Sequence, residues 1–238
     1  MLGAQILVLV LSPGSYRAEN RTSLLRHIYQ ATAPSLLWFT VLTSLLSLVL
    51  IRIVVVTAQS YGLSQYAVEM VVRVLVLELI PLIAALFVAV RYSVPHGAEV
   101  YEVRAPGGID AGRSQSLDAV AQELLPSVMA GVVAVITLAA LSCLVSLVLA
   151  YLTVYGFTSA AFMSYTRIVG KIFNPAVTLI LCLKTLFFSL AVSLIPAGVA
   201  LQGLPGRLSR ARVELQGLVR MFVVLLVVEV ASLVGNYY

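Results

Sequence analysis

Charged residues are scarce in this chain. Only 11% of its 238 residues are Asp, Glu, Lys or Arg, whereas 61% are hydrophobic. A water-soluble domain could not hide so much apolar surface, so the composition excludes that class and makes the bilayer part of the solvent. We expect one membrane domain over residues 1–238, with no room for a separate soluble catalytic domain.

Residues and motifs that carry out chemistry are also few. The chain has two cysteines and two histidines, and it contains no GxxxxGK[ST], HExxH or G-x-S-x-G motif. Cys143 and Cys182 lie within apolar stretches, and His27 and His96 have no Cys or carboxylate at ligand spacing. We therefore expect no catalytic residue, no metal site and no cofactor in this chain. The absence of an extended basic soluble face argues against a nucleic-acid partner.

Long apolar stretches fill most of the sequence. Each meets or exceeds the roughly 20 residues that a helix needs to cross a hydrocarbon core. The pattern predicts an all-α integral membrane protein with five transmembrane helices, over residues 34–58, 67–92, 124–155, 173–196 and 214–235. An amphipathic pattern over residues 15–33 predicts an N-terminal helix that lies in the membrane interface.

Arginines cluster on alternate sides of these stretches, which predicts an orientation because Lys and Arg concentrate in short cytoplasmic loops. The N-terminus and the 93–122 and 197–213 loops are then cytoplasmic. The 59–66 loop and the C-terminal Tyr238 are external, and so is the 156–172 loop, although it carries two cations. The three clusters are Arg17, Arg21 and Arg26; Arg91, Arg104 and Arg113; and Arg207, Arg210 and Arg212.

A few charges remain inside the spans, where each costs roughly 2.5–3.5 kcal/mol at a helix centre. Glu78 precedes Pro81, which removes a helix hydrogen bond and favours a bend or an unwound turn. Glu78 then either lines a cavity or gate, or is neutral and hydrogen-bonded to a freed carbonyl. Lys184 and Glu229 are candidates for an interhelical pair, and Arg220 is the fourth such charge. Glu69 and Arg73 have the spacing of an ion pair on one helix face.

The segment LELIPLIAALFVAVRYS, followed by GAEV, resembles the MlaE-type permeases, which are membrane subunits of ABC transporters that move phospholipids in bacteria and plastids. The family pattern reads approximately (R)ELGP, an apolar run, GR-small-GS, and then AEI…MR…IDA…DP…PR. The resemblance covers roughly residues 20–235. The matching positions are Glu78, Leu79, Pro81, Arg91, Ala98, Glu99, Arg104, Ile109, Asp110, Ala111, Asp118 and Pro126, and later Lys184, Pro205, Arg212 and Glu229, where the family has Asp.

The chain also departs from the family pattern. Leu77 replaces the arginine before ELGP, and RYSVP replaces the small-residue run. Pro106-Gly107-Gly108 is expected to break a stretch that is helical in the family, and Ala119 replaces a proline. These changes leave open a divergent working permease or a subunit with weakened coupling.

The resemblance implies a homodimer in the bacterial inner membrane with a lipid-holding cavity. Cytoplasmic ATPase subunits that bind ATP and Mg would dock on the 93–122 loops, a periplasmic MCE-domain hexamer would cover the outer face, and a STAS-domain protein sometimes joins the ATPase. It assigns a phospholipid path to Glu78, Pro81, Tyr61, Tyr66 and Lys184. It assigns ATPase coupling to Arg91, Glu99, Arg104, Asp110 and Asp118.

Two other functions stay open on the sequence. The first is a scaffold that anchors a periplasmic lipid-binding ring without transport, which the Pro-Gly-Gly triplet motivates. The second is an ion-coupled carrier in which Glu78 and Lys184 relay a proton or ion.

Overall fold

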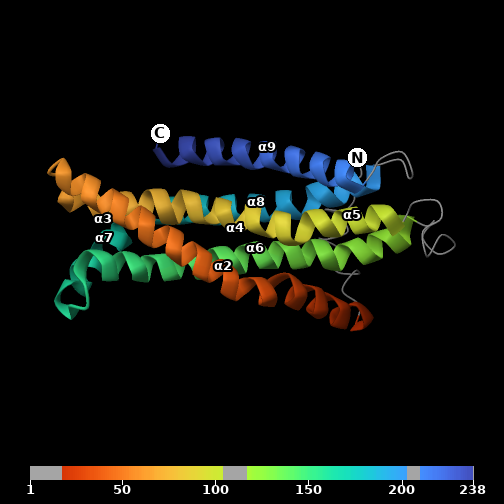
Figure 1. The fold of residues 1–238 in the computed structure, drawn as a ribbon, viewed down its shortest axis with the longest axis horizontal. Helices are drawn as coiled ribbons and strands as arrows, with labels where there is room; N and C mark the ends of the chain where they lie inside the picture. Colours follow the sequence, from red (N-terminus) through yellow and green to blue (C-terminus); the bar gives the residue numbers. More distant parts are fainter. Residues whose placement is uncertain (1–17, 104–116, 203–209, 238) are drawn as a thin grey trace.

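The computed structural model describes residues 18–103, 117–202 and 210–237. These ranges are helical apart from short turns, and they contain no strand. The long helices run lengthwise in one bundle, as Figure 1 shows. The helices are α2 (Ala18–Ser60), α3 (Ala67–Val71), α4 (Ile80–Val88), α5 (Val94–Val103), α6 (Leu117–Tyr155), α7 (Phe162–Ile172), α8 (Pro175–Gln202) and α9 (Arg210–Tyr237).

The second span is one continuous helix with two π-helical segments. Between α3 and α4 lies the π-helix η3 (Val72–Leu79), and between α4 and α5 lies the π-helix η4 (Ala89–Ser93). Short 3₁₀ turns, η2 (Ser64–Tyr66) and η5 (Ser159–Ala161), precede α3 and α7. The second span is therefore the least regular of the described spans. Because π-helical turns are rare and often mark functional sites, it is the first place to look for one.

The prediction of an all-α protein with five spans is confirmed. Within the described residues, five helices are long and apolar enough to cross a membrane. Many of their large apolar side chains face outward, among them Leu45, Ile53 and Val227. In water this surface would be costly, but in a bilayer it meets lipid. The spans are Leu25–Ser60, Ala67–Glu99, Pro126–Tyr155, Pro175–Val199 and Ala211–Asn236.

Several helix boundaries differ from the sequence prediction. Helix α2 passes through Pro34 without a break, so the structure does not separate an interfacial helix at 15–33 from the first span. Helix α8 likewise continues past Pro196 to Gln202. Prolines are tolerated in membrane helices because neighbouring groups satisfy the freed backbone carbonyls. The 156–172 segment, expected as a loop, contains α7, and parts of the 93–122 loop belong to α5 and α6.

The turn after α2 shows how the chain reverses at one end of the bundle. Gly62 has a φ of +71°, a left-handed conformation that favours glycine. Its N–H donates to the carbonyl of Gln59 at 3.0 Å, and the N–H of Leu63 donates to that of Ala58 at 2.7 Å. This is a Schellman motif, which ends a helix while satisfying its last carbonyls.

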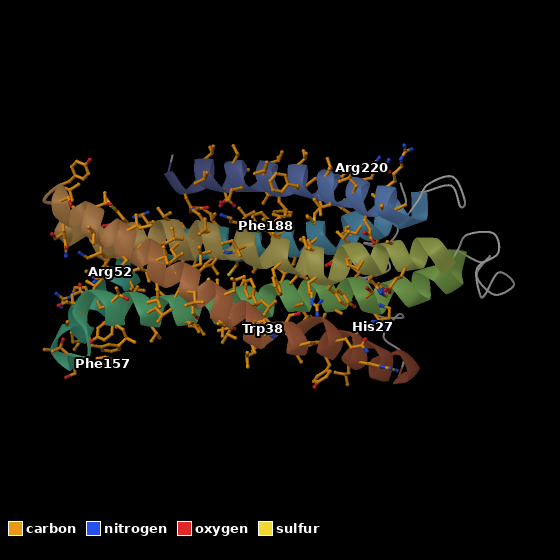
Figure 2. The ribbon with its side chains drawn as sticks, viewed as in Figure 1. His27, Trp38, Arg52, Phe157, Phe188 and Arg220 are labelled. Carbon is orange, nitrogen blue, oxygen red and sulfur yellow. The ribbon has the colours of Figure 1, made fainter. Side chains whose placement is uncertain are left out.

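Small and hydroxyl-bearing residues bring the spans into close contact. Helix α2 packs most extensively against α6, where Ser47 and Ser146 are hydrogen-bonded at 2.8 Å. A Cβ on Gly131 of α6 would lie 2.6 Å from Oγ of Ser193 on α8. Larger side chains fill the rest of the core, and Figure 2 shows Phe188 inside the bundle, whereas Trp38 and Phe157 point away from it. Small residues at helix crossings are typical of membrane helix packing.

The bundle has two distinct ends. Figure 1 shows α3, α7 and the end of α9 at one end, with α5 and the starts of α2, α6 and α9 at the other. The first of these we call the outer end and the second the inner end, following the orientation predicted from the arginine clusters.

Candidate functional site

In the irregular second span, two backbone carbonyls accept hydrogen bonds from side chains of other helices. Pro81 lacks an N–H, so the carbonyl about one turn before it has no partner within the helix. In the structure Nζ of Lys184 donates to the carbonyl oxygen of Leu77 at 3.3 Å, and Sγ of Cys143 lies 3.6 Å from that of Val76. Side chains from α8 and α6 thus satisfy the backbone where the second span leaves α-helical pitch.

A buried charge cluster forms at this point from Glu78, Lys184, Glu229 and Asn236. Lys184 is 2% exposed and donates a hydrogen bond to Oε2 of Glu78. Its Nζ lies 2.8 Å from Oε2 of Glu229, although that oxygen accepts no well-directed hydrogen bond. Nδ2 of Asn236 donates to Oε1 of Glu78 at 3.2 Å. The cluster therefore joins the second span, α8 and α9.

The charge cluster answers a question that the sequence left open. Glu78 is not bonded to a freed carbonyl, because Lys184 occupies that position and pairs with Glu78 instead. The predicted Lys184–Glu229 interhelical pair is confirmed. A buried cation in lipid requires such partners, and here one ammonium faces two carboxyl groups. The phenyl ring of Phe188, with its centroid 5.7 Å from Nζ, covers another side of the cation.

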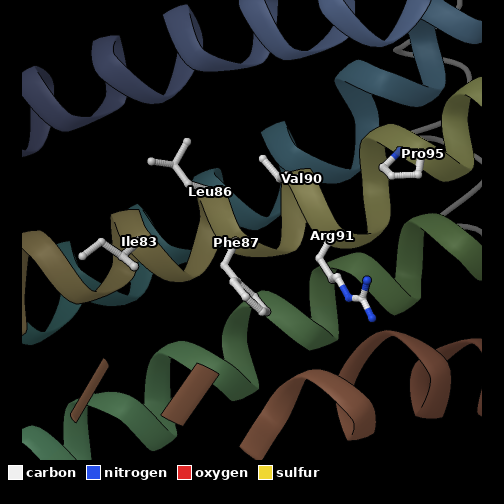
Figure 3. Close-up of a pocket in the computed structure, with 6 residues that line it drawn as sticks. All are labelled: Ile83, Leu86, Phe87, Val90, Arg91 and Pro95. Atoms are coloured by element: carbon white, nitrogen blue, oxygen red, sulfur yellow. The ribbon is translucent and has the colours of Figure 1, made fainter. Parts of the chain in front are cut away.

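Two apolar grooves lie along the same part of the bundle. One, of about 350 Å³, is lined by Pro81, Ile136, Cys143, Leu181 and Leu186, among others. The other, of about 580 Å³, is lined by Ile83, Leu86, Phe87, Val90, Arg91 and Pro95. Figure 3 shows that Phe87 and Arg91 extend to the same side of the second span. This second groove is apolar along its length and carries one cation toward the inner end.

The tyrosines predicted for the lipid path lie elsewhere. Tyr61 is 77% exposed in the turn after α2, and Tyr66 lines a separate pocket with Glu69 and Arg73. Neither hydrogen-bonds to the charge cluster. The predicted Glu69–Arg73 ion pair is present, with Nε of Arg73 3.0 Å from Oε1 of Glu69.

The residues predicted for ATPase coupling are not brought together in the described part of the chain. Arg91 is exposed in the groove of Figure 3, and Glu99 is exposed on α5. Asp118 belongs to α6, but its side chain lies outside the described set. Arg104, Asp110 and the Pro106-Gly107-Gly108 triplet also lie outside the described residues. Arg220 is exposed on α9, as Figure 2 shows, and forms none of the ion pairs of the charge cluster.

The structure also brings together residues to which the sequence gave no role. Asn236 joins the charge cluster from the far end of the chain, a contact that no local pattern signals. At the inner end the hydroxyl of Tyr92 lies 3.4 Å from Nδ1 of His27, and the ring of His96 stacks on Tyr92 with centroids 5.8 Å apart. These contacts link the first part of α2 to the second span. No group of three or more metal-ligating residues occurs within the described ranges.

Comparison with known proteins gives the family. No match to a curated protein was found. The family model described as "Permease MlaE" matches residues 24–234, which include four of the spans in full and all but the last two residues of the fifth. The matched residues include Glu78, Lys184 and Glu229 together with the irregular second span. The chain is therefore a multi-pass membrane permease subunit that belongs to the MlaE permease family.

Proposed function

We propose that this chain is the permease of an ABC transporter that moves phospholipids between the bacterial inner membrane and a periplasmic MCE-domain hexamer. Two copies would pair as a homodimer, with N-termini in the cytoplasm and C-termini in the periplasm. A separate ATPase subunit would bind ATP and Mg and hydrolyse the nucleotide, since this sequence has no phosphate-binding loop. A STAS-domain protein is a further candidate partner on the ATPase.

The observation that carries the lipid part of this proposal is the groove of Figure 3. Its lining is apolar over five residues, and the sixth, Arg91, is a cation exposed at the inner end. An amphipathic molecule matches this distribution, because acyl chains replace water along the apolar wall and an arginine binds phosphate through several N–H groups. The volume of about 580 Å³ lies within the range of ordinary ligand pockets.

The packing of α5 supplies a route by which a cytoplasmic motor could act on the spans. Helix α5 packs against α8 and α9, and a Cβ on Gly97 would lie 3.1 Å from the carbonyl oxygen of Pro196. Helices α8 and α9 carry Lys184 and Glu229. A push on α5 would therefore move the two helices that carry Lys184 and Glu229. The contacts of the charge cluster would then be present in one state of the transport cycle and broken in the other.

Co-purification tests the assembly. The tagged chain, expressed with a candidate ATPase partner, should retain that ATPase and bound phospholipid. Glu99→Ala should weaken ATPase retention, because Glu99 is exposed on α5 and its one described ionic contact is with His96 at 3.6 Å. The matched control is Glu69→Ala at the opposite end of the second span, and the two variants are compared in ATPase retention only, because Glu69 lines a separate pocket. If the Glu99 variant retains an intact and active ATPase complex, the assignment of the coupling surface is wrong.

A second candidate, an ion-coupled carrier, is favoured by the charge cluster itself. One ammonium between two carboxyl groups inside the membrane is an arrangement that proton relays use. Such a carrier would move its substrate in vesicles that contain this chain alone, and the rate would follow an imposed proton gradient. Glu78→Gln would then abolish transport.

A further inference from the structure

The separate pocket that contains Tyr66 lies at the outer end, between the start of the second span and α7. It has a volume of about 320 Å³ and is lined by Tyr66, Glu69, Arg73, Ile168, Lys171 and Ile172. It shares no residue with the charge cluster or with the groove of Figure 3. Its lining is a mixture of polar and apolar groups, unlike the two apolar grooves.

The charges around this pocket do not balance. Arg73 uses Nε to pair with Oε1 of Glu69 at 3.0 Å, which leaves its other guanidinium N–H groups available. Lys171 is exposed, and within the described part of the chain its ammonium forms no ion pair or hydrogen bond. Two cations and one carboxylate thus leave an excess positive charge, which favours an anionic ligand that accepts hydrogen bonds from both cations.

The position of the pocket indicates the source of the anion. Lys171 and the buried Ile172 come from α7, whose polar and apolar residues lie on different faces, as in helices that lie in a membrane interface. Near its start, Phe162 and Met163 are exposed, and Phe157 in the preceding turn is 95% exposed. Tyr66 lines the pocket and is itself exposed, as interfacial tyrosines are. Amphipathic helices and exposed aromatic side chains of this kind lie at the depth of the lipid phosphates.

We propose that this pocket binds the phosphate group of an anionic phospholipid from the outer leaflet. Lys171 and Arg73 contact the phosphate oxygens, and Glu69 holds the guanidinium in place. Ile168 and Ile172 form the apolar wall along which the first carbons of the lipid pack. Lipid binding at this site requires only that the chain is inserted in a membrane, and it does not require ATP-driven transport. A negative result for this site would therefore leave the proposed transport function untouched, and the reverse also holds.

Lipid retention without nucleotide tests the site. The full-length chain is placed in nanodiscs of phosphatidylcholine with a small fraction of phosphatidylglycerol, and bound phosphatidylglycerol is measured by native mass spectrometry after release into detergent. Lys171→Gln should weaken retention about tenfold, the effect of losing one charge-assisted hydrogen bond. Arg167→Gln, which removes an exposed charge from the same helix but does not line the pocket, should change it less than about twofold.

Four outcomes would overturn the proposal. Equal retention by all three proteins would mean that the pocket does not hold lipid. Equal loss in both variants would mean a general attraction of α7 to anionic membranes. Binding of inorganic phosphate that depends on Lys171, with unchanged lipid retention, would assign the site to free phosphate. Binding of a poly-glutamate peptide that depends on Lys171, again with unchanged lipid retention, would assign it to an acidic protein segment. A thermal unfolding curve equal to that of the wild type shows that Lys171→Gln is folded.

Discussion

Nζ of Lys184 on α8 lies 2.8 Å from Oε2 of Glu229 on α9, and the same nitrogen hydrogen-bonds to Glu78 and to the carbonyl of Leu77 in the second span. One ammonium group therefore connects three of the five spans at the point where one of them changes from π-helical to α-helical pitch. Because the ammonium is buried, its contribution to the stability of the fold depends on its partners. Removing it would leave two carboxyl groups without a countercharge.

Replacing this lysine should destabilise the fold strongly. Lys184→Met keeps the length of the side chain but leaves Glu78 and Glu229 unpaired and the Leu77 carbonyl without a donor. We expect a loss of about 3–5 kcal/mol in the free energy of unfolding, measured in detergent by thermal or denaturant unfolding. Arg52→Met, at an exposed position on α2, is the control and should cost less than about 1 kcal/mol. Equal effects of the two substitutions would contradict the structural role of the charge cluster.

The two carboxyl groups should respond differently to neutralisation. Glu229→Gln removes one of two negative charges that face a single ammonium, and it keeps nearly the same shape. We expect a change below about 1 kcal/mol. Glu78→Gln should cost more, because Glu78 accepts hydrogen bonds from both Lys184 and Asn236. Unfolding measurements on the two variants test this order. A larger loss of stability in Glu229→Gln than in Glu78→Gln would contradict it.

Close packing of α6 against α8 can be tested at Gly131. Gly131→Ala would place a methyl group 2.6 Å from Oγ of Ser193 and 3.3 Å from Oγ of Ser93. Overpacking of this kind costs about 1–3 kcal/mol. Ser193→Ala removes the closer oxygen, so the double variant should recover part of the loss. A double variant no more stable than Gly131→Ala would show that the contact with Ser193 is not the cause.

Helix α7 should loosen at high pH. Burial raises the pKa of Tyr165 from its ordinary value of 10.0 to about 12, and its hydroxyl donates to the carbonyl of Leu147 at 2.8 Å. Below pH 10 the phenol is neutral in both the folded and the unfolded state, so the full stability is present. Between pH 10 and about 12 only the unfolded state loses its proton, and stability falls as the pH rises.

The loosening of α7 would be followed by unfolding measurements at several pH values. Tyr165→Phe has no proton to lose at this position, so its stability should show a smaller fall over the same range. It should also be less stable than the wild type at neutral pH, by about 1 kcal/mol for the lost hydrogen bond. An identical fall in both proteins would mean that other groups cause it.

The number and approximate limits of the spans could be predicted from the sequence, because hydrophobic length alone decides which segments cross a bilayer. The disturbed helix near Glu78 was also predictable, since Pro81 removes a hydrogen-bond donor wherever it stands in a helix. The Lys184–Glu229 pair followed from the cost of leaving either charge alone in lipid. Each of these inferences needs only local sequence or the energy of a single group.

Features that depend on how helices pack could not be predicted. Nothing near Asn236 indicates that it contacts Glu78, because that contact depends on the rotation of α9 against the second span. The continuation of α2 through Pro34 and of α8 past Pro196 could not be predicted either, since a proline ends a helix in water more often than in a bundle where neighbours satisfy the backbone. The pocket that contains Lys171 likewise arises only when α7 folds onto the second span.

Reconstituted transport tests the central claim most directly. Proteoliposomes would contain this chain with the proposed ATPase and MCE-domain partners, and the transfer of a fluorescent phospholipid to or from the MCE-domain protein would be followed. The account predicts transfer that requires ATP hydrolysis, is indifferent to a proton gradient and is impaired by Glu78→Ala. Transfer that follows a proton gradient without the ATPase, or lipid binding with no ATP-dependent transfer, would contradict it.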